Sequence, residues 1–243
     1  MDTIILIPTY NEKNNLCELV DEIRQRSGAD ILFIDDNSTD GTAMLADELS
    51  ARHKGIHVLH RPKKEGIGMA YKEGFRWAMA RPYRYFLMMD ADLSHDPDAL
   101  PLFLEKIKTH DAVFGSRYVE GVSVYRWSFA RLVFSKFSNA LISFFLGLPQ
   151  STDTTTAYKC FRRETLEKIG VENLWGKKNS FLIHLVYKTI KQGFKTSEIL
   201  FVFSGRKKGK SKSHASIVTE STKVIFFLFF HRVFRRRKKS SKP

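Results

Sequence analysis

Two aspartates, Asp90 and Asp92, stand out in this sequence because they follow directly on the apolar run at residues 85–89. A strand that ends in Asp-x-Asp directs its carboxylates beyond the carboxyl end of a sheet, and we expect surface acids that pack little. Magnesium typically binds one or two protein carboxylates together with the phosphate oxygens of a substrate. The pair therefore indicates a site for a metal-bound diphosphate. The alternative is an ordinary surface turn, since aspartate is common in turns and Pro97 suits the start of a helix.

Polar motifs also follow two other predicted strands. Residues 8–12, Pro-Thr-Tyr-Asn-Glu, come after the first strand, and residues 35–42, Asp-Asp-Asn-Ser-Thr-Asp-Gly-Thr, come after the second. In an open α/β sheet, ligands bind beyond the carboxyl ends of the strands. Taken singly, Asp36 or Ser38 could be a helix-capping residue. Three such motifs at three strand ends favour one shared pocket.

The order of the expected elements gives the fold class. Alternating strand and helix patterns in the first half favour an α/β fold whose mostly parallel sheet carries helices on both faces. Strands are predicted at residues 3–8, 31–34, 56–59, 84–89 and 112–114. Helices are predicted at residues 12–26, from residues 39–42 onward, and at 68–80 and 98–108.

The second half of the chain is less regular. A very apolar helix is predicted at residues 129–147, another helix at 180–192 and a strand at 195–203. Residues 118–128 and 204–216 are expected to be flexible segments.

The positive charge of the chain is concentrated in two places. The formal net charge is +14, and it falls to +2 without the twelve basic residues of two clusters. Those clusters consist of Arg206, Lys207, Lys208, Lys210 and Lys212, and of Arg232, Arg235, Arg236, Arg237, Lys238, Lys239 and Lys242. Local clusters of this kind suggest anionic partners such as phosphates, a membrane surface or nucleic acid.

The two cysteines, Cys17 and Cys160, define no disulfide or metal framework. The sequence opens on a short strand without a basic leader, so we expect a reducing, cytoplasmic location. No run of about 20 apolar residues occurs, and we therefore expect no ordinary transmembrane helix.

The motifs occur in an order that resembles a known family. Pro-x-Tyr-Asn-Glu, Ile-Asp-Asp-x-Ser-x-Asp-Gly-Thr, Gly-x-Gly-x-Ala at 66–70, Asp-Ala-Asp-Leu-Ser-His and Gly-Ser-Arg-Tyr at 115–118 follow one another along the chain. This set resembles family 2 glycosyltransferases, and more narrowly the dolichyl-phosphate or polyprenyl-phosphate mannosyltransferases. The resemblance covers roughly residues 3–215. It implies a GT-A fold, with a Rossmann-like, mostly parallel central sheet flanked by helices, over residues 1–215.

The resemblance implies a nucleotide-sugar pocket at the first two strand ends. Pro8, Tyr10 and Glu12 match residues of that pocket in the family. Ile34 and Asp36 match positions that hold the base, with the Asp36 carboxylate accepting from the ring N–H groups.

The resemblance also implies a metal site at the third strand end. Asp90, Ala91 and Asp92 match the family's sugar-diphosphate and metal site, for Mg²⁺ or Mn²⁺, and Asp92 is the best metal ligand. Ser94 stands where some relatives have a glutamine ligand, so its role is in doubt. The metal would neutralise the departing diphosphate, which is Lewis-acid and template catalysis.

Four basic residues match cations of the family's active site. Arg117 matches a residue that contacts the bound sugar nucleotide, and Arg131 is the better candidate for clamping the lipid phosphate, because the planar guanidinium suits phosphate oxygens. With Asp92, these two arginines form the expected catalytic set. Arg206 and Lys212 match the cations of a late Arg-x-x-Gly-x-Ser-Lys loop that covers the donor phosphates in relatives. The alternative is that these are paired or solvated surface charges.

Two places depart from the family pattern. Residues 153–159 read Asp-Thr-Thr-Thr-Ala-Tyr-Lys, where relatives usually have Asp-x-Thr-Ser-Gly-Phe-Arg, and Ala157 allows less backbone freedom than glycine. His184 stands where relatives often have a glutamate. It could change the charge beside the sugar or lipid, or it could be a packed core histidine.

The resemblance implies sugar transfer, with mannose from GDP-mannose as the first interpretation, onto a polyprenyl or dolichyl monophosphate. Alternatives are a UDP-sugar donor, a different acceptor, a non-catalytic interaction protein that kept the fold, and a nucleic-acid-binding module. The intact motif residues argue against loss of activity. Because the remainder of the chain is nearly neutral, we expect no nucleic-acid partner.

A lipid acceptor requires contact with a membrane. Residues 224–230 are apolar but too few to span a bilayer, and five basic residues follow at 235–239. This pattern, within a tail at residues 216–243, is typical of an amphipathic helix on an anionic leaflet. The helix at 129–147 could form a second contact, or could be ordinary core. We expect peripheral attachment to the cytoplasmic side of a membrane, directly or through a small transmembrane partner.

Overall fold

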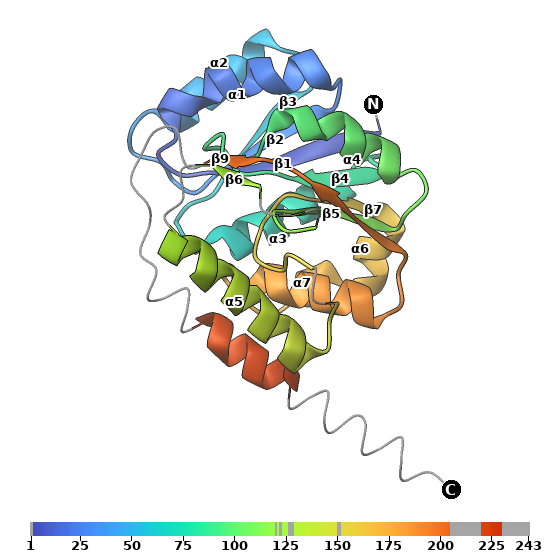
Figure 1. Ribbon diagram of the computed structural model, residues 1–243. Coiled ribbons are helices and arrows are strands. Elements are labelled where there is room, and N and C mark those ends of the chain that lie inside the picture. The colour runs from blue at the N-terminus through green and yellow to red at the C-terminus, as the bar shows by residue number, and fades with distance from the viewer. Residues whose placement is uncertain are drawn as a thin grey trace, which may run out of the picture.

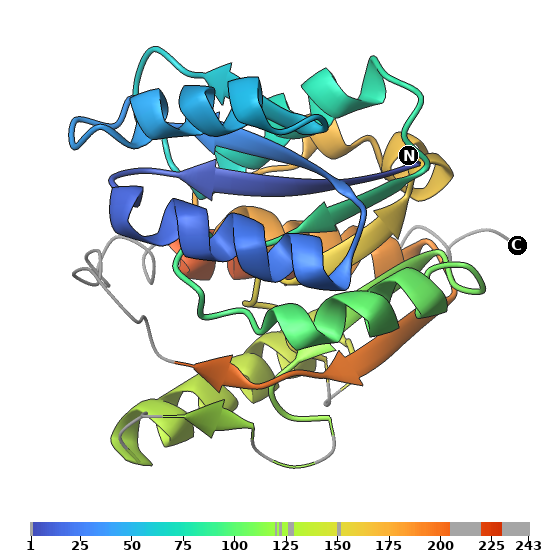
Figure 2. The same cartoon turned by 90° about the horizontal axis from the view of Figure 1, so that it is seen from above.

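The computed structural model describes residues 2–119, 121, 123–125, 129–149, 152–204 and 220–229, and all structural statements below concern these residues. Its centre is a seven-stranded sheet with helices on both faces (Figures 1 and 2).

The sheet has the strand order β3-β2-β1-β4-β7-β5-β8, and only β7 runs antiparallel to its neighbours. Its strands are β1 (Thr3–Thr9), β2 (Asp30–Asp35), β3 (Ile56–His60), β4 (Tyr85–Met88), β5 (Ala112–Ser116), β7 (Lys159–Arg162) and β8 (Thr196–Leu200). Two short strands, β6 (Val124–Tyr125) and β9 (Phe203–Ser204), form a separate parallel pair. The mostly parallel sheet that the sequence predicted is confirmed.

The helices cover the sheet in two layers. One face carries α1 (Lys13–Arg26), α2 (Thr42–Arg52) and α4 (Leu100–Lys106), and the other carries α3 (Ile67–Met79), α6 (Arg163–Ile169) and α7 (Ser180–Lys191). Two 3₁₀ turns lie at Pro97–Ala99 and Val171–Asn173. The long helix α5 (Phe129–Leu146) and a final helix at residues 220–229 lie side by side outside the second layer (Figure 1).

The apolar run in β1 shows why the sheet is covered on both faces. Successive side chains of a strand point to opposite faces. Ile5 and Ile7 pack in the core beneath α1, whereas Ile4 and Leu6 pack in the core that includes α3. A strand buried on both sides reads as a continuous apolar run rather than an alternating one.

The second half differs from the expectation in several elements. The strands β6 and β7 and the helix α6 were not predicted, and the expected strand at 195–203 is divided into β8 and β9. The final helix is also part of the packed structure, because Val224 and Leu228 are buried in the same core as α7.

Candidate active site at the carboxyl ends of the strands

A tight turn after β4 presents the Asp90–Asp92 pair. The strand is held against β1 up to its last bond, in which Met89 N–H donates to the Leu6 carbonyl at 3.1 Å. Within the turn, Ser94 N–H donates to Asp92 Oδ1 at 3.1 Å. Leu93 takes a left-handed backbone conformation with φ of 58°, which non-glycine residues rarely adopt. Such a backbone persists only where its surroundings determine it.

Contacts of His95 hold much of this turn in place. Its Nδ1 accepts from Asp90 N–H at 3.0 Å, and its Nε2 lies 3.2 Å from Thr156 Oγ1. The ring stacks on Tyr158 with centroids 4.8 Å apart. Burial lowers the pKa of His95 to about 3, so the ring is neutral at pH 7. Since Nδ1 accepts, the proton sits on Nε2, and His95 fixes the turn rather than titrating.

The expectation that Asp92 is a surface acid is wrong. Asp92 is only 6% exposed, because the turn folds back over its own carboxylate, whereas the Asp90 side chain is 31% exposed. A change at Asp92 must therefore preserve the acceptor for Ser94 N–H if the turn is to stay intact.

The donor set of this turn fits a hard divalent cation. Asp90 and Asp92 offer carboxylate oxygens, and the buried Ser94 hydroxyl beside them has no hydrogen-bond partner among the described residues. In the described part of the chain, no group of three or more His, Cys, Asp or Glu side chains could hold a metal by itself. Mg²⁺ usually takes one or two carboxylates and completes its shell with water and substrate phosphates, which matches this set.

A polar network holds the first two strand ends together. Thr9 Oγ1 donates to Asp35 Oδ1 at 3.1 Å, and Ser38 Oγ donates to the same oxygen at 2.6 Å. Glu12 N–H donates to Thr42 Oγ1 at 2.9 Å, which joins the start of α1 to the start of α2. Asp35 and Thr42 are thus structural, and the network positions the residues between them.

Among the residues assigned to the donor pocket, Ile34 has a side chain that packs into the core. Pro8 and Ile34 are paired in register across β1 and β2. Ile34 is fully buried, and a Cβ at Gly74 of α3 would lie only 2.3 Å from its Cδ1. The Ile34 side chain thus packs against α3, and its role toward a base stays a prediction.

Asp36 is paired with a residue that the sequence analysis did not single out. Its carboxylate forms an ion pair with Arg61, which follows β3, and both side chains are buried. Arg61 also reaches Glu73 at 3.0 Å and Glu65 at 3.2 Å. Burial raises the pKa of Asp36, and Arg61 opposes that rise. The only hint in the sequence was the position of Arg61 directly after an apolar strand.

Tyr10 lies beside the same group. The Lys64 ammonium stands 3.6 Å from the centroid of the Tyr10 ring, and its charge also acts on Asp36. The expected base-binding end of the site thus combines an aromatic ring, a buried carboxylate and two cations, Arg61 and Lys64.

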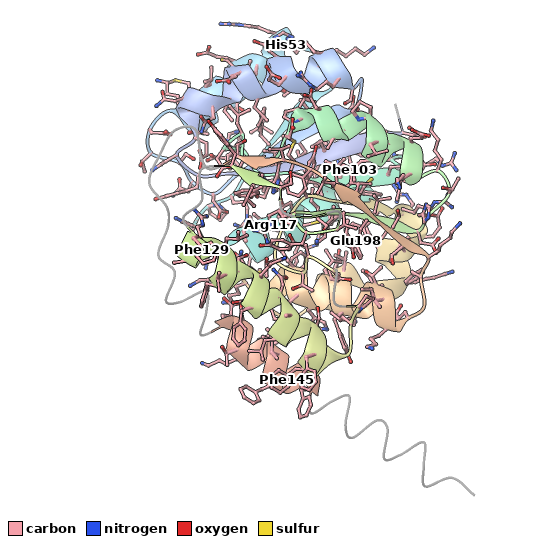
Figure 3. All side chains as sticks on the ribbon, viewed as in Figure 1. His53, Phe103, Arg117, Phe129, Phe145 and Glu198 are labelled. Carbon is pink, nitrogen blue, oxygen red and sulfur yellow. The ribbon has the colours of Figure 1, made fainter. Side chains whose placement is uncertain are left out.

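Arg117 is not a surface charge. Its Nε and Nη2 donate to the two carboxylate oxygens of Asp153 at 2.6 and 2.9 Å, and Nη2 also donates to Thr155 Oγ1 at 2.7 Å. The Lys159 ammonium donates to the Asp153 carbonyl at 2.8 Å, and burial lowers the pKa of Lys159 to about 8. Figure 3 shows Arg117 in the interior between the sheet and α5. The charge of Asp90 acts on Arg117, so the Arg117–Asp153 pair lies near the Asp90–Asp92 turn.

The Arg117–Asp153 pair predicts a specific loss of stability in acid. Although burial opposes ionisation, Arg117 holds the pKa of Asp153 at about 2, below its ordinary value of 3.8. A carboxyl group whose pKa is lower in the folded than in the unfolded protein stabilises the folded state at pH values above its unfolded pKa. This stabilisation is lost as the pH falls through the folded pKa. For Asp153 it amounts to about 2 kcal/mol.

We therefore expect Asp153→Asn to lower the free energy of unfolding by about 3–5 kcal/mol at neutral pH, because Arg117 is left buried without its counter-charge. The difference from the unaltered protein should shrink as pH falls from about 4 to 2. Urea denaturation across this range measures it, with Glu105→Gln on exposed α4 as the control. A difference that does not change with pH would contradict the assignment.

Arg131 lies in the first turn of α5, near Arg117. Partial burial and then the charge of Arg117 lower its pKa. Tyr118, whose hydroxyl donates to Ser135 Oγ at 2.7 Å, joins this end of α5 to the segment after β5. The structure thus brings Asp90, Arg117 and Arg131 to one region, while their roles toward a substrate stay predictions.

The remaining candidates divide into two groups. Arg206 and Lys212 lie outside the described residues. His184 is buried, and its Nδ1 accepts from Trp175 N–H at 2.8 Å, as a packed core histidine does. Ala157 is buried in the core below the Thr156–His95 contact.

Sequence comparison shows which family the chain resembles. Residues 4–170 match the family described as glycosyl transferase family 2. The chain is 40% identical over 222 residues to the polyprenol monophosphomannose synthase of Mycolicibacterium smegmatis, covering 90% of this chain and 83% of that protein. It is 37% identical to the undecaprenyl-phosphate mannosyltransferase of Micrococcus luteus, with 91% of each chain covered.

Solved structures with low sequence identity share the fold. One is the glucosyl-3-phosphoglycerate synthase of Mycobacterium tuberculosis in complex with Mn²⁺ and UDP, with a TM-score of 0.64 at 16% identity, covering 92% of this chain and 77% of that one. Another is a mannosyltransferase from Pyrobaculum calidifontis in complex with GDP-Man and Mn²⁺, with a TM-score of 0.57 at 18% identity, covering 86% and 58%. The expected GT-A fold is confirmed. The chain belongs to glycosyltransferase family 2 and is a glycosyltransferase whose relatives include polyprenyl-phosphate mannosyltransferases.

Proposed function

We propose that this enzyme transfers mannose from GDP-mannose to a polyprenyl monophosphate at the cytoplasmic face of a membrane, with a divalent cation. The names of the relatives at 37–40% identity support lipid-phosphate mannosyl transfer. The GDP-Man and Mn²⁺ complex of a structural neighbour supports the choice of donor and metal type.

The observation that best supports a lipid acceptor is the distribution of polar and apolar residues around α5. Three of its polar residues recur every four positions and face the protein, Ser135, Asn139 and Ser143, whereas Arg131 and Lys136 are exposed. Asn139 Oδ1 accepts from Thr154 N–H at 3.0 Å, and Asn139 Nδ2 donates to Thr155 Oγ1, the hydroxyl that Arg117 also contacts. The opposite face carries exposed phenylalanines. A surface helix usually turns its apolar side toward the protein core, whereas α5 turns its apolar side outward.

The outward face of α5 is too apolar for a surface in water. Phe129, Phe134, Phe137 and Phe144 are 81%, 63%, 63% and 71% exposed. Figure 3 marks the two ends of this helix at Phe129 and Phe145. The final helix extends the surface with Phe226 and Phe227, about half exposed. Contiguous apolar patches of this kind mark membrane or partner sites, and ordinary core packing does not explain α5.

Among the described residues, α5 is the single helix that is long and apolar enough to cross a membrane. Only 22% of α5 is buried, yet its polar edge is bonded to the site. We therefore infer that α5 lies in the plane of the interface, with the basic tail, outside the described residues, adding attraction to anionic lipid.

In this proposal, the lipid phosphate would lie beside the donor diphosphate. Arg131 in the first turn of α5 would clamp the acceptor phosphate where the apolar face meets the site. The second pKa of a phosphate monoester is about 6, so the acceptor is largely dianionic at neutral pH and needs no strong general base. Its oxygen attacks C1 of the sugar, the bond from C1 to the diphosphate oxygen breaks, and the nucleoside diphosphate leaves with the electron pair.

The chain's own residues position the two reactants. Asp36, held by Arg61, would accept from the N–H groups of guanine, and Tyr10 would offer a face to the ring. Asp90, Asp92 and the Ser94 hydroxyl would hold Mg²⁺ or Mn²⁺, and the bound ion would neutralise charge on the departing diphosphate. Arg117 would add positive charge near the same group, with Asp153 fixing its direction.

The test is incubation of the full chain with radiolabelled GDP-mannose, UDP-glucose or UDP-N-acetylglucosamine, each with Mg²⁺ and a defined polyprenyl phosphate, followed by lipid extraction. We expect label in the lipid phase from GDP-mannose. Label from a UDP-sugar instead would correct the donor, and label in no lipid phase would contradict the proposed acceptor.

A further inference from the structure

We propose that Glu220 is a positioning residue that couples the membrane-facing final helix to the donor pocket. This inference rests on the proposed function, because it assigns the final helix a role in donor binding as well as in membrane contact.

The Glu220 carboxylate is bonded to the start of α7. Its Oε1 accepts from Lys177 N–H at 2.6 Å, from Lys178 N–H at 3.2 Å and from Ser180 Oγ at 2.6 Å. Although burial opposes it, these hydrogen bonds lower the pKa of Glu220. The carboxylate therefore stays charged at the positive end of the α7 dipole, where it is stabilised. Glu220 and Lys177 are 43 residues apart, so this bond is tertiary.

The segment that Glu220 holds is bonded in turn to the start of α3. The Lys177 carbonyl accepts from Gly68 N–H at 2.8 Å. Gly68 lies in the first turn of α3, where backbone N–H groups have no partner within the helix. A Cβ at Gly66 would lie 2.5 Å from the Lys177 carbonyl oxygen, and one at Gly68 would lie 2.7 Å from Phe181 Cβ. Glycine at both positions permits this close approach.

The start of α3 is linked to Asp36 through Arg61. Glu65, next to Gly66 in the chain, bonds to Arg61 at 3.2 Å, and Glu73 of α3 bonds to Arg61 at 3.0 Å. Arg61 holds Asp36. A continuous set of bonds thus runs from Glu220 through residues 177–178 and the start of α3 to the carboxylate expected to read the base.

A second contact ties the final helix to the same segment. Trp175 and Phe227 stack with ring centroids 6.1 Å apart. Elsewhere the fit is looser, because a cavity of about 280 Å³ lies between α7 and the final helix, next to Phe227, Leu228, Lys188 and Lys191. Besides the core packing of Val224 and Leu228, the specific contacts at Glu220 and Phe227 thus tie this helix to residues 175–180. Membrane binding through the final helix should then tighten donor binding without adding a contact to the donor.

Amide hydrogen exchange tests the coupling without any nucleotide or lipid. In Glu220→Ala we expect the Gly68 amide to exchange roughly tenfold faster than in the unaltered chain, equivalent to about 1.4 kcal/mol. Glu220→Gln should restore most of the protection, because its amide oxygen still accepts. If Glu220 anchors only its own helix, Lys177 and Lys178 amides will exchange faster and Gly68 will not, which overturns the proposal.

Phe227→Ala and Phe226→Ala form a matched pair if Glu220→Ala does not fold. The two rings are 52% and 54% exposed, but the one at 227 stacks on Trp175. We expect faster Gly68 exchange in Phe227→Ala and unchanged exchange in Phe226→Ala. Equal rates in the two variants would contradict the coupling.

GDP titration with Mg²⁺ then tests the functional consequence. With vesicles of phosphatidylcholine and phosphatidylglycerol in equal amounts, the Kd for GDP should fall severalfold in the unaltered chain and stay constant in Glu220→Ala. In transfer assays, Glu220→Ala should raise the donor KM and leave kcat unchanged, the signature of lost uniform binding. Failure of the chain to bind vesicles would refute the proposed membrane role, whereas the exchange result would still decide the coupling.

Discussion

Replacing Asp92 by asparagine is expected to slow sugar transfer roughly a thousandfold, the scale seen when one charge-stabilising group is removed from an active site. The amide oxygen of the new side chain can still accept from Ser94 N–H, as Asp92 Oδ1 does, so the turn should stay folded. What is lost is the negative charge that holds the cation on the departing diphosphate. Initial rates at saturating Mg²⁺, with thermal unfolding to check the fold, measure the effect.

Asp96→Asn is the matched control for this substitution. It makes the same chemical change four residues along the chain, at a side chain that accepts from Asp98 N–H and caps a 3₁₀ turn. We expect it to turn over at nearly the normal rate. Normal turnover by Asp92→Asn would show that the metal-site assignment is wrong.

Removing three outward phenylalanines of α5 should nearly abolish binding to vesicles. Each phenyl group moved out of water contributes roughly 1.5–3 kcal/mol. Joint replacement of Phe134, Phe137 and Phe144 by alanine should therefore weaken partitioning by roughly a hundredfold or more. Because the three side chains are exposed, the fold should be unaffected. Vesicle co-sedimentation measures the partition coefficient.

The corresponding triple leucine variant is the control, since leucine retains an apolar side chain of similar burial energy. It should bind almost normally, and increased salt should weaken binding of both proteins by screening the basic tail. Binding by the alanine variant equal to that of the unaltered chain would exclude α5 as a membrane contact.

Truncation before Ile217 is a poor test of the same idea. Val224 and Leu228 are buried in the core, and Glu220 caps α7. Truncation would remove these contacts together with the exposed Phe226 and Phe227. Point substitutions on the exposed face separate membrane contact from stability.

The parallel sheet was predictable because its strands are buried on both faces and read as short apolar runs such as Ile4–Ile7. The positions of Tyr10, Asp36 and Asp90 at strand ends followed from the same pattern, since parallel strands end at one edge of the sheet. β7 was not predictable in this way. It has four residues, it begins with the buried cation Lys159 and ends in Arg162, and no apolar period marks it.

The partners of the site residues also lay beyond the sequence pattern. Arg61 meets Asp36 across 25 residues, and Asp153 meets Arg117 across 36. Such pairs are set by the three-dimensional packing of β3 on β2 and of the 153–156 segment beside β5. The outward face of α5 was ambiguous for a related reason. An apolar helical pattern does not show which side of the helix packs on the protein. The hydrogen bond from Thr154 N–H to Asn139 Oδ1 identifies that side.

The most direct test of the proposed reaction is mass spectrometry of the lipid phase after incubation with GDP-mannose and Mg²⁺. Two matched acceptors are needed, a polyprenyl phosphate and the polyprenol of the same length without phosphate. The proposal predicts a gain of one hexose on the phosphate lipid and none on the alcohol. A hexose on the alcohol, or release of GDP with no change in either lipid, would contradict transfer to a lipid phosphate.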